Sequence, residues 1–145
     1  MDKETLERYA ELMVEGFKND PGEKWQLNGI ENGWEIFKLQ SLCQLDVFSK
    51  LNCLTTYGDG EGLVLGYFLN NEFLQQLANQ WQQSEYVMKM TRQIPQQVLM
   101  QLKQQQIEVM EVAQPDWYVK FIGDKEVYVL QIIVIKEELR GTGVF

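Results

Sequence analysis

The sequence predicts an α+β fold in which a mixed, mostly antiparallel sheet is flanked by helices. Apolar residues recur at helical spacing over residues 2–50 and again over 71–113, and two short β-like runs separate these segments. A third run, Val127–Ile135, is apolar at every position except Gln131. The length of 145 residues, 45% of them hydrophobic, suits one domain covering residues 1–145 with an adequate core.

Two helices are expected first. Asp2 is placed to cap a helix whose apolar residues share one face, and the turn residues Asn19-Asp20-Pro21-Gly22 end it. A second helix over residues 31–50 has a wide apolar arc, which predicts burial on more than one side. The arc consists of Trp34, Ile36, Phe37, Leu39, Cys43, Val47 and Phe48.

A hairpin and three more helices follow. Residues 52–57 and 63–69 are β-like and flank a glycine-rich loop, residues 58–62. In residues 71–113, Ser84 is a predicted cap and Pro95 suits a first helical turn. The many glutamines of this segment are interpreted as a solvated helix face: Gln75, Gln76, Gln80, Gln82, Gln83, Gln96, Gln97, Gln101, Gln104, Gln105 and Gln106.

The last part of the chain is predicted to be β-structure. Pro115-Asp116 breaks the helix, residues 117–122 form a strand, and a turn at 123–125 leads into Val127–Ile135. Both alternating faces of that final strand are apolar. Such a strand is expected in the middle of a sheet, buried under helices on both sides.

Charge and composition exclude several classes of function. Thirteen basic against 21 acidic residues give a net charge of −8, which argues against nucleic-acid and anionic-membrane partners. A cationic partner such as an amine fits better, although the charge also serves solubility. With no histidine, and with Cys43 and Cys53 as the only thiols, a zinc site and a histidine-activated nucleophile are excluded. The charged N-terminus and the lack of a long apolar stretch indicate a soluble, cytoplasmic protein.

The loop after the final strand is the segment most indicative of chemistry. A short connector, residues 136–139, leads into Arg140-Gly141-Thr142-Gly143. Glycines permit positive φ and close phosphate approach, successive backbone N–H groups bind a diphosphate, and an arginine adds a charged donor. Gly-x-Gly alone is equally typical of a plain turn, but neither a Walker loop nor a dinucleotide loop matches this spacing.

A strand that runs into an Arg-x-x-Gly-x-Gly/Ala loop resembles the GNAT superfamily of N-acyltransferases, and the likeness covers residues 117–145. The resemblance implies an acyl-CoA N-acyltransferase-like fold, acetyl-CoA as a substrate and no metal. It assigns the pantetheine arm to Ile133, Val134 and Ile135. It assigns the pyrophosphate to Arg140, Gly141, Thr142, Gly143, Val144 and Phe145. Phe145 stands where that signature has Gly or Ala, and the family continues beyond this point, so an N-terminal portion of the domain is expected.

The expected function is acetyl transfer from acetyl-CoA to a small-molecule or peptide amine. No catalytic residue is assigned, because Gln131 is no base and the carboxylates of Asp59, Glu61, Asp124 and Glu126 are typical of solvated loops. Trp25, Trp34, Tyr57 and Tyr67 are candidates for an acceptor pocket or for the core. The alternatives are a non-catalytic interaction module and a phosphate- or nucleotide-binding domain. Self-association through the final strand is also expected, because the chain supplies no later strand to cover its edge.

Overall fold

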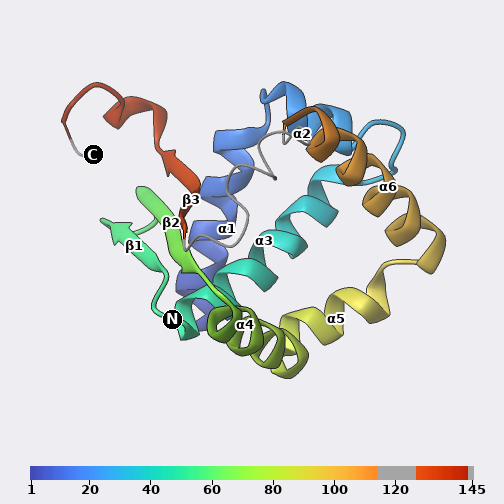
Figure 1. Cartoon of the computed structure of the whole chain (residues 1–145). Coiled ribbons are helices and arrows are strands. Elements are labelled where there is room, and N and C mark those ends of the chain that lie inside the picture. Colours follow the sequence, from blue (N-terminus) through green and yellow to red (C-terminus); the bar gives the residue numbers. More distant parts are fainter. Residues whose placement is uncertain (114–126, 144–145) are drawn as a thin grey trace.

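The computed structural model describes residues 1–113 and 127–143 (Figure 1). The described residues form an α+β structure, as predicted. The helices are α1 (Lys3–Phe17), α2 (Pro21–Gln26), α3 (Gly33–Lys50), α4 (Asn71–Gln83), α5 (Glu85–Gln93) and α6 (Gln96–Ala113). The strands are β1 (Leu54–Tyr57), β2 (Gly62–Leu69) and β3 (Val127–Ile135), and a 3₁₀ helix, η1, covers Glu137–Leu139.

The described sheet is antiparallel throughout, with the order β1-β2-β3. The hairpin joining β1 and β2 is confirmed, and its loop places Gly58 and Gly60 at φ values of +60° and +77°, which favour glycine. The pairing of β2 with β3 shifts register between Leu65 and Gly66. Their partners are Ile132 and Leu130, so Gln131 is an extra residue on β3 and forms a β-bulge.

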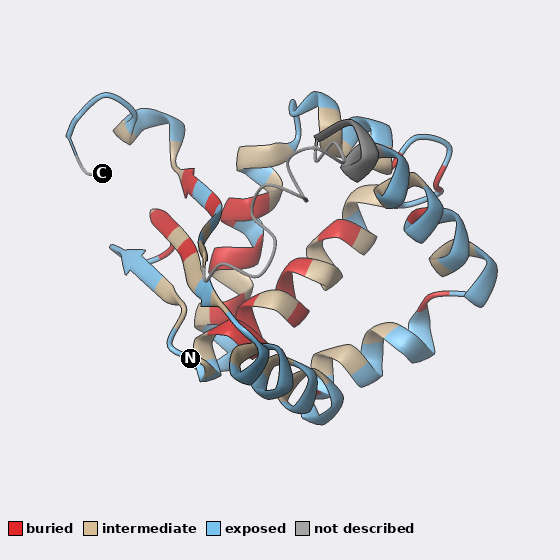
Figure 2. Cartoon of the chain, viewed as in Figure 1, coloured by how far each residue is buried: buried red, intermediate tan, exposed pale blue. Residues whose placement is uncertain are grey.

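The core lies between the sheet and the two helices α1 and α3, which Figure 2 shows as the elements richest in buried residues. Helix α1 approaches β3 closely at Gly16, because a Cβ added there would collide with the Val134 side chain. Sixteen buried residues make one cluster: Leu6, Tyr9, Ala10, Leu12, Met13, Leu27, Ile30, Phe37, Leu42, Leu45, Phe48, Leu63, Leu65, Leu102, Ile132 and Val134. The predicted apolar faces of the first two helices are therefore confirmed.

The three helices expected over residues 71–113 are confirmed as α4, α5 and α6. Ser84 is the N-cap of α5, as predicted, and it is completely buried. Its hydroxyl donates a hydrogen bond of 2.6 Å to Oδ2 of Asp46, a buried residue of α3. This bond ties the α4–α5 junction to the core helix.

Helix α2 was not predicted. The sequence interpretation took Pro21-Gly22 as the end of the first helix, but Asp20 caps a new helix by accepting a 2.9 Å hydrogen bond from the Glu23 N–H. Pro21 stands in the first turn, where its missing N–H costs nothing. An N-cap aspartate followed by proline is a helix start, and this signal was available in the sequence.

The prediction that β3 is buried on both faces, in the middle of the sheet, is wrong for the described residues. In the described part of the sheet β3 lies at an edge and pairs only with β2. Ile132 and Val134 are buried, whereas Tyr128, Leu130 and Ile133 are each more than half exposed. An apolar pattern on both faces of a strand does not reveal whether anything covers the second face.

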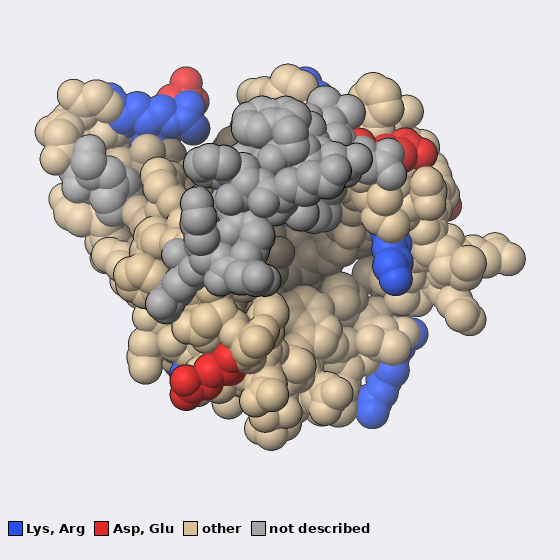
Figure 3. All heavy atoms as spheres, in the orientation of Figure 1, with Lys and Arg blue, Asp and Glu red and all other residues tan. Residues whose placement is uncertain are grey.

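The glutamine-rich helices lie mostly at the surface, as predicted. Eight of the glutamines are exposed: Gln75, Gln76, Gln82, Gln83, Gln96, Gln97, Gln101 and Gln104. Figure 3 shows that Lys, Arg, Asp and Glu are sparse on the face shown in the orientation of Figure 1. The strand predicted at residues 117–122 and the turn predicted at 123–125 lie outside the described residues.

Candidate functional site

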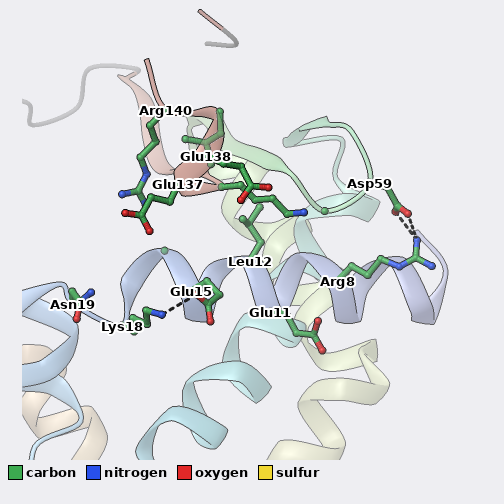
Figure 4. A pocket seen from close by; sticks show the side chains of 14 residues that line it. Arg8, Glu11, Leu12, Glu15, Lys18, Asn19, Asp59, Glu137, Glu138 and Arg140 are labelled. Atoms are coloured by element: carbon green, nitrogen blue, oxygen red, sulfur yellow. Dashed lines mark hydrogen bonds and ion pairs between the residues drawn. The ribbon is translucent and has the colours of Figure 1, made fainter. Parts of the chain in front are cut away.

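A cavity of about 590 Å³ lies where β3 runs into the connector that precedes the predicted phosphate loop. Helix α1 forms one wall, the β1–β2 loop forms a second, and the connector with Arg140 forms a third (Figure 4). Its lining residues are Arg8, Glu11, Leu12, Glu15, Gly16, Lys18, Asn19, Asp59, Gly60, Ile135, Lys136, Glu137, Glu138 and Arg140. The fold therefore places part of the predicted loop at the mouth of a ligand-sized space.

Charges of both signs line this cavity. Arg8 is held by Asp59 and Glu4, and Lys18 lies 2.9 Å from Glu15. Within the described ranges Lys136 and Arg140 form no ion pair, so these are the two cations left for a ligand. The acidic lining residues, Glu11, Glu15, Asp59, Glu137 and Glu138, outnumber the four cations and oppose an anionic ligand.

The glycines of the predicted loop have the backbone geometry of an anion site. Gly141 and Gly143 have φ values of +78° and +85°, and Thr142 between them is not in the positive-φ region. This alternation is typical of the backbone concavities that bind anions. In the described part of the chain the N–H groups of Gly141 and Gly143 have no acceptor, whereas the Thr142 N–H donates to the Leu139 carbonyl at 3.3 Å.

Of the three residues predicted to bind the pantetheine arm, one turns its backbone N–H and C=O groups toward β2 and two turn theirs to the opposite edge of β3. The Lys136 N–H donates to the Glu61 carbonyl at 2.9 Å, so that pair is hydrogen-bonded across the sheet. Because hydrogen-bonded and non-hydrogen-bonded pairs alternate in an antiparallel ladder, Val134 also turns its backbone groups toward β2. Ile133 and Ile135 turn theirs to the other edge, where no described strand pairs with them.

The other candidates are not gathered at one site. Asp59 is engaged by Arg8, and Glu61 lies in the hairpin loop with its carbonyl bonded to Lys136. Asp124, Glu126, Val144 and Phe145 lie outside the described residues. Of the candidate aromatic residues, Trp25 and Tyr57 are exposed, Trp34 lies edge-on against Phe37, and Tyr67 stacks on Phe73 with ring centroids 4.6 Å apart.

A second cavity, which the sequence does not predict, is lined by Gln131 of the bulge and by Ile132 beside it. It has a volume of about 220 Å³ and is formed by α1, α2, α3, α6 and β3. Its lining residues are Met13, Phe17, Glu23, Gln26, Phe37, Gln40, Ser41, Gln44, Gln106, Gln131 and Ile132. Burial raises the pKa of the Glu23 carboxyl to about 7, and the negative charge of Asp20 adds to the rise.

The thiols offer no reactive site. Burial raises the pKa of the Cys43 thiol to about 12, with Asp46 adding to the effect, so Cys43 stays protonated and unreactive at neutral pH. Cys43 is buried as predicted, and Cys53 is only half-buried. Across residues 1–113 and 127–143, no group of His, Cys, Asp and Glu has the arrangement of a metal site, and no helix there has the length and apolarity to cross a bilayer.

Comparisons of the chain with protein-family models, with curated proteins and with solved structures found no match. The loop, the strand edge and the two cavities are therefore the features from which a function can be inferred.

Proposed function

We propose that this chain binds acetyl-CoA as an N-acyltransferase that transfers the acetyl group to an amine. The observation that carries the proposal is the arrangement at the end of β3. Among the described residues, no strand covers the outer edge of β3 at Ile133 and Ile135, and the N–H groups of Gly141 and Gly143 have no acceptor. Ile135 and Arg140 line the 590 Å³ cavity. The resemblance of residues 117–145 to the GNAT signature supports the same reading.

The two halves of coenzyme A match two different features. The pyrophosphate needs donors, and the Gly141 and Gly143 N–H groups together with the Arg140 guanidinium supply them. The pantetheine arm contains amide groups, which pair with a free strand edge in the way an added peptide strand does. Ile133 and Ile135 offer that edge, whereas the backbone groups of Val134 face β2 and its side chain is buried in the core.

The direction of the arm follows from the strand. If the pyrophosphate binds at Gly141 and Gly143, the arm runs back along β3 from Ile135 toward Gln131. At a strand rise of about 3.3 Å per residue, those four steps cover roughly 13 Å. The reactive thioester end would thus approach the bulge at Gln131, a residue that lines the second cavity.

Titration of the chain with coenzyme A tests the proposal. Three donors to charged groups contribute about 1.5–3 kcal/mol each, and association costs at least about 4 kcal/mol, so the dissociation constant should be about 0.2 mM or weaker. Gly141→Val and Gly143→Val should abolish this binding, because a branched side chain strains a positive φ and obstructs the phosphate. Gly29→Val is the matched control, since Gly29 has a φ of +75° but lies away from the loop.

Two further ligands separate the alternatives. Inorganic pyrophosphate should bind more weakly than coenzyme A, because it lacks the arm that pairs with β3. Equal affinities for the two ligands would indicate a phosphate-binding domain, and binding of neither would favour a non-catalytic interaction module. Release of free thiol from acetyl-CoA in the presence of primary amines, measured with a thiol reagent, would test the transfer itself.

A further inference from the structure

Among the described residues that line the cavity beside the bulge there is one carboxylate and no cation. Glu23 forms no ion pair, and its carboxylate accepts no hydrogen bond, within the part of the chain that the structure describes. The cavity residues from α1, α3, α6 and β3 are all uncharged, and Asp20 is the charged group whose field acts on Glu23. A partly buried carboxylate without a partner is costly, and a bound cation would remove that cost.

We propose that this cavity binds the ammonium group of a small primary amine, with Glu23 as its counter-ion. The identification of this amine as the acyl acceptor rests on the proposed function, but the binding site itself does not. A volume of about 220 Å³ is below the usual range of drug-sized pockets, about 300–1,000 Å³, so a small amine or the end of a longer one fits.

The rest of the lining favours an organic ammonium over a metal ion. An ammonium has three donors, and the side-chain oxygens of Gln40, Gln44 and Gln131 are available as neutral acceptors beside the one carboxylate. Phe17 and Phe37, with ring centroids 6.0 Å apart, provide aromatic surface that attracts a cation and covers an apolar stem. Divalent metals in proteins usually bind several oxygen ligands with more than one carboxylate, which this cavity lacks.

The position of the cavity gives Glu23 a catalytic role if the acyl-CoA arm ends near Gln131. The Glu23 carboxylate accepts one proton from the ammonium, and the nitrogen lone pair then attacks the thioester carbonyl. The C–N bond forms and the C–S bond breaks, with its electron pair leaving on sulfur. Of the two protons that the nitrogen loses, one ends on the thiol and one passes to solvent. A carboxyl that titrates near neutral pH is suited to this base role.

Titration with n-butylammonium, followed by NMR, tests the binding site. We expect saturable shifts of the Met13 methyl and of the Gln131 side-chain amide, both in the cavity wall. n-Butanol, which has the same stem without the charge, should bind at least tenfold more weakly. Shifts elsewhere on the molecule, or equal binding of the alcohol, would overturn the proposal.

Glu23→Gln should weaken n-butylammonium binding at least tenfold. Glu85→Gln is the matched control, because Glu85 is also in the first turn of a helix but is exposed and outside the cavity. For the wild type, affinity should rise between pH 5.5 and pH 8 as Glu23 loses its proton, because the amine stays charged throughout this interval. Unchanged affinity in Glu23→Gln, or no pH dependence, would exclude Glu23 as the counter-ion.

The two proposals fail in distinguishable ways. Amine binding without coenzyme A binding keeps the amine site and removes the acyltransferase function. Coenzyme A binding without n-butylammonium binding keeps the cofactor site and removes Glu23 from the acceptor site.

Discussion

Glu23→Gln should stabilise the protein above neutral pH and leave its stability unchanged in acid. The folded state raises the Glu23 pKa from 4.5 to about 7, chiefly through burial. The folded protein therefore binds more protons than the unfolded chain between these two pH values. By linkage, the free energy of unfolding contributed by Glu23 falls as pH rises through this window and stays low above it. Glutamine has nearly the same shape but carries no charge to desolvate.

The size of the effect follows from the pKa difference. A rise from 4.5 to about 7 corresponds to at most about 3 kcal/mol, at 1.36 kcal/mol per pKa unit. The Glu23 side chain keeps part of its exposure, and solvent screening reduces this figure. We expect Glu23→Gln to raise the free energy of unfolding by about 1–2 kcal/mol at pH 8.5 and by less than about 0.5 kcal/mol at pH 4.5.

Urea denaturation at the two pH values measures this directly, with tryptophan fluorescence as the signal. The free energies of unfolding of wild type and variant are compared at each pH, so that the contributions of the other carboxyl groups cancel. Glu85→Gln, at an exposed first-turn position, should instead lose a few tenths of a kcal/mol from the helix dipole at pH 8.5. A difference between wild type and Glu23→Gln that is the same at both pH values would refute the argument from burial.

Three other perturbations test the packing and the strand edge. Gly16→Ala should destabilise the folded protein by about 1 kcal/mol in thermal unfolding, because the collision of the new methyl group with Val134 outweighs the higher helix propensity of alanine. In a Val134→Ala background this loss of stability should disappear. Ser84→Ala should cost about 1–3 kcal/mol in the same assay, because the buried Asp46 carboxylate loses its hydroxyl donor. Sedimentation at about 100 μM should show self-association of the wild type through β3. Ile133→Lys should abolish this association, because a charge at an exposed position of an edge strand prevents strand pairing. A monomeric wild type would contradict the prediction.

The helices and the hairpin were predictable because their signals are local. Ser84 caps α5, Pro95 stands immediately before α6, one residue outside the predicted first turn, and the loop glycines at 58–62 fix the hairpin within a few residues. Helix α2 was missed although Asp20 and Pro21 carry the same kind of local signal, because proline followed by glycine was read as a terminator.

The position of β3 and the role of Glu23 were not predictable, because both depend on contacts between distant parts of the chain. The apolar pattern of β3 fits a central strand as well as an edge strand with an exposed apolar face. Glu23 looks like an ordinary first-turn glutamate in the sequence. Burial raises its pKa most, and the described lining of the cavity beside it comes from α1, α3, α6 and β3, which are distant from Glu23 in the sequence.

The outer edge of β3, which no described strand covers, connects the cofactor proposal with self-association. Ile133 and Ile135 have one outward set of backbone groups each, and either the pantetheine arm or a second chain can pair with that set, but not both. Two ligands that compete for the same donors and acceptors have a negative coupling free energy, and the effect is reciprocal. Saturating coenzyme A should therefore shift the sedimentation boundary toward monomer, and raising the protein concentration should weaken coenzyme A binding. Inorganic pyrophosphate, which reaches the loop but not the edge, should leave the association unchanged. An association that coenzyme A does not affect would separate the dimer contact from the predicted arm site, and the assignment of Ile133 and Ile135 to the cofactor would lose its structural basis.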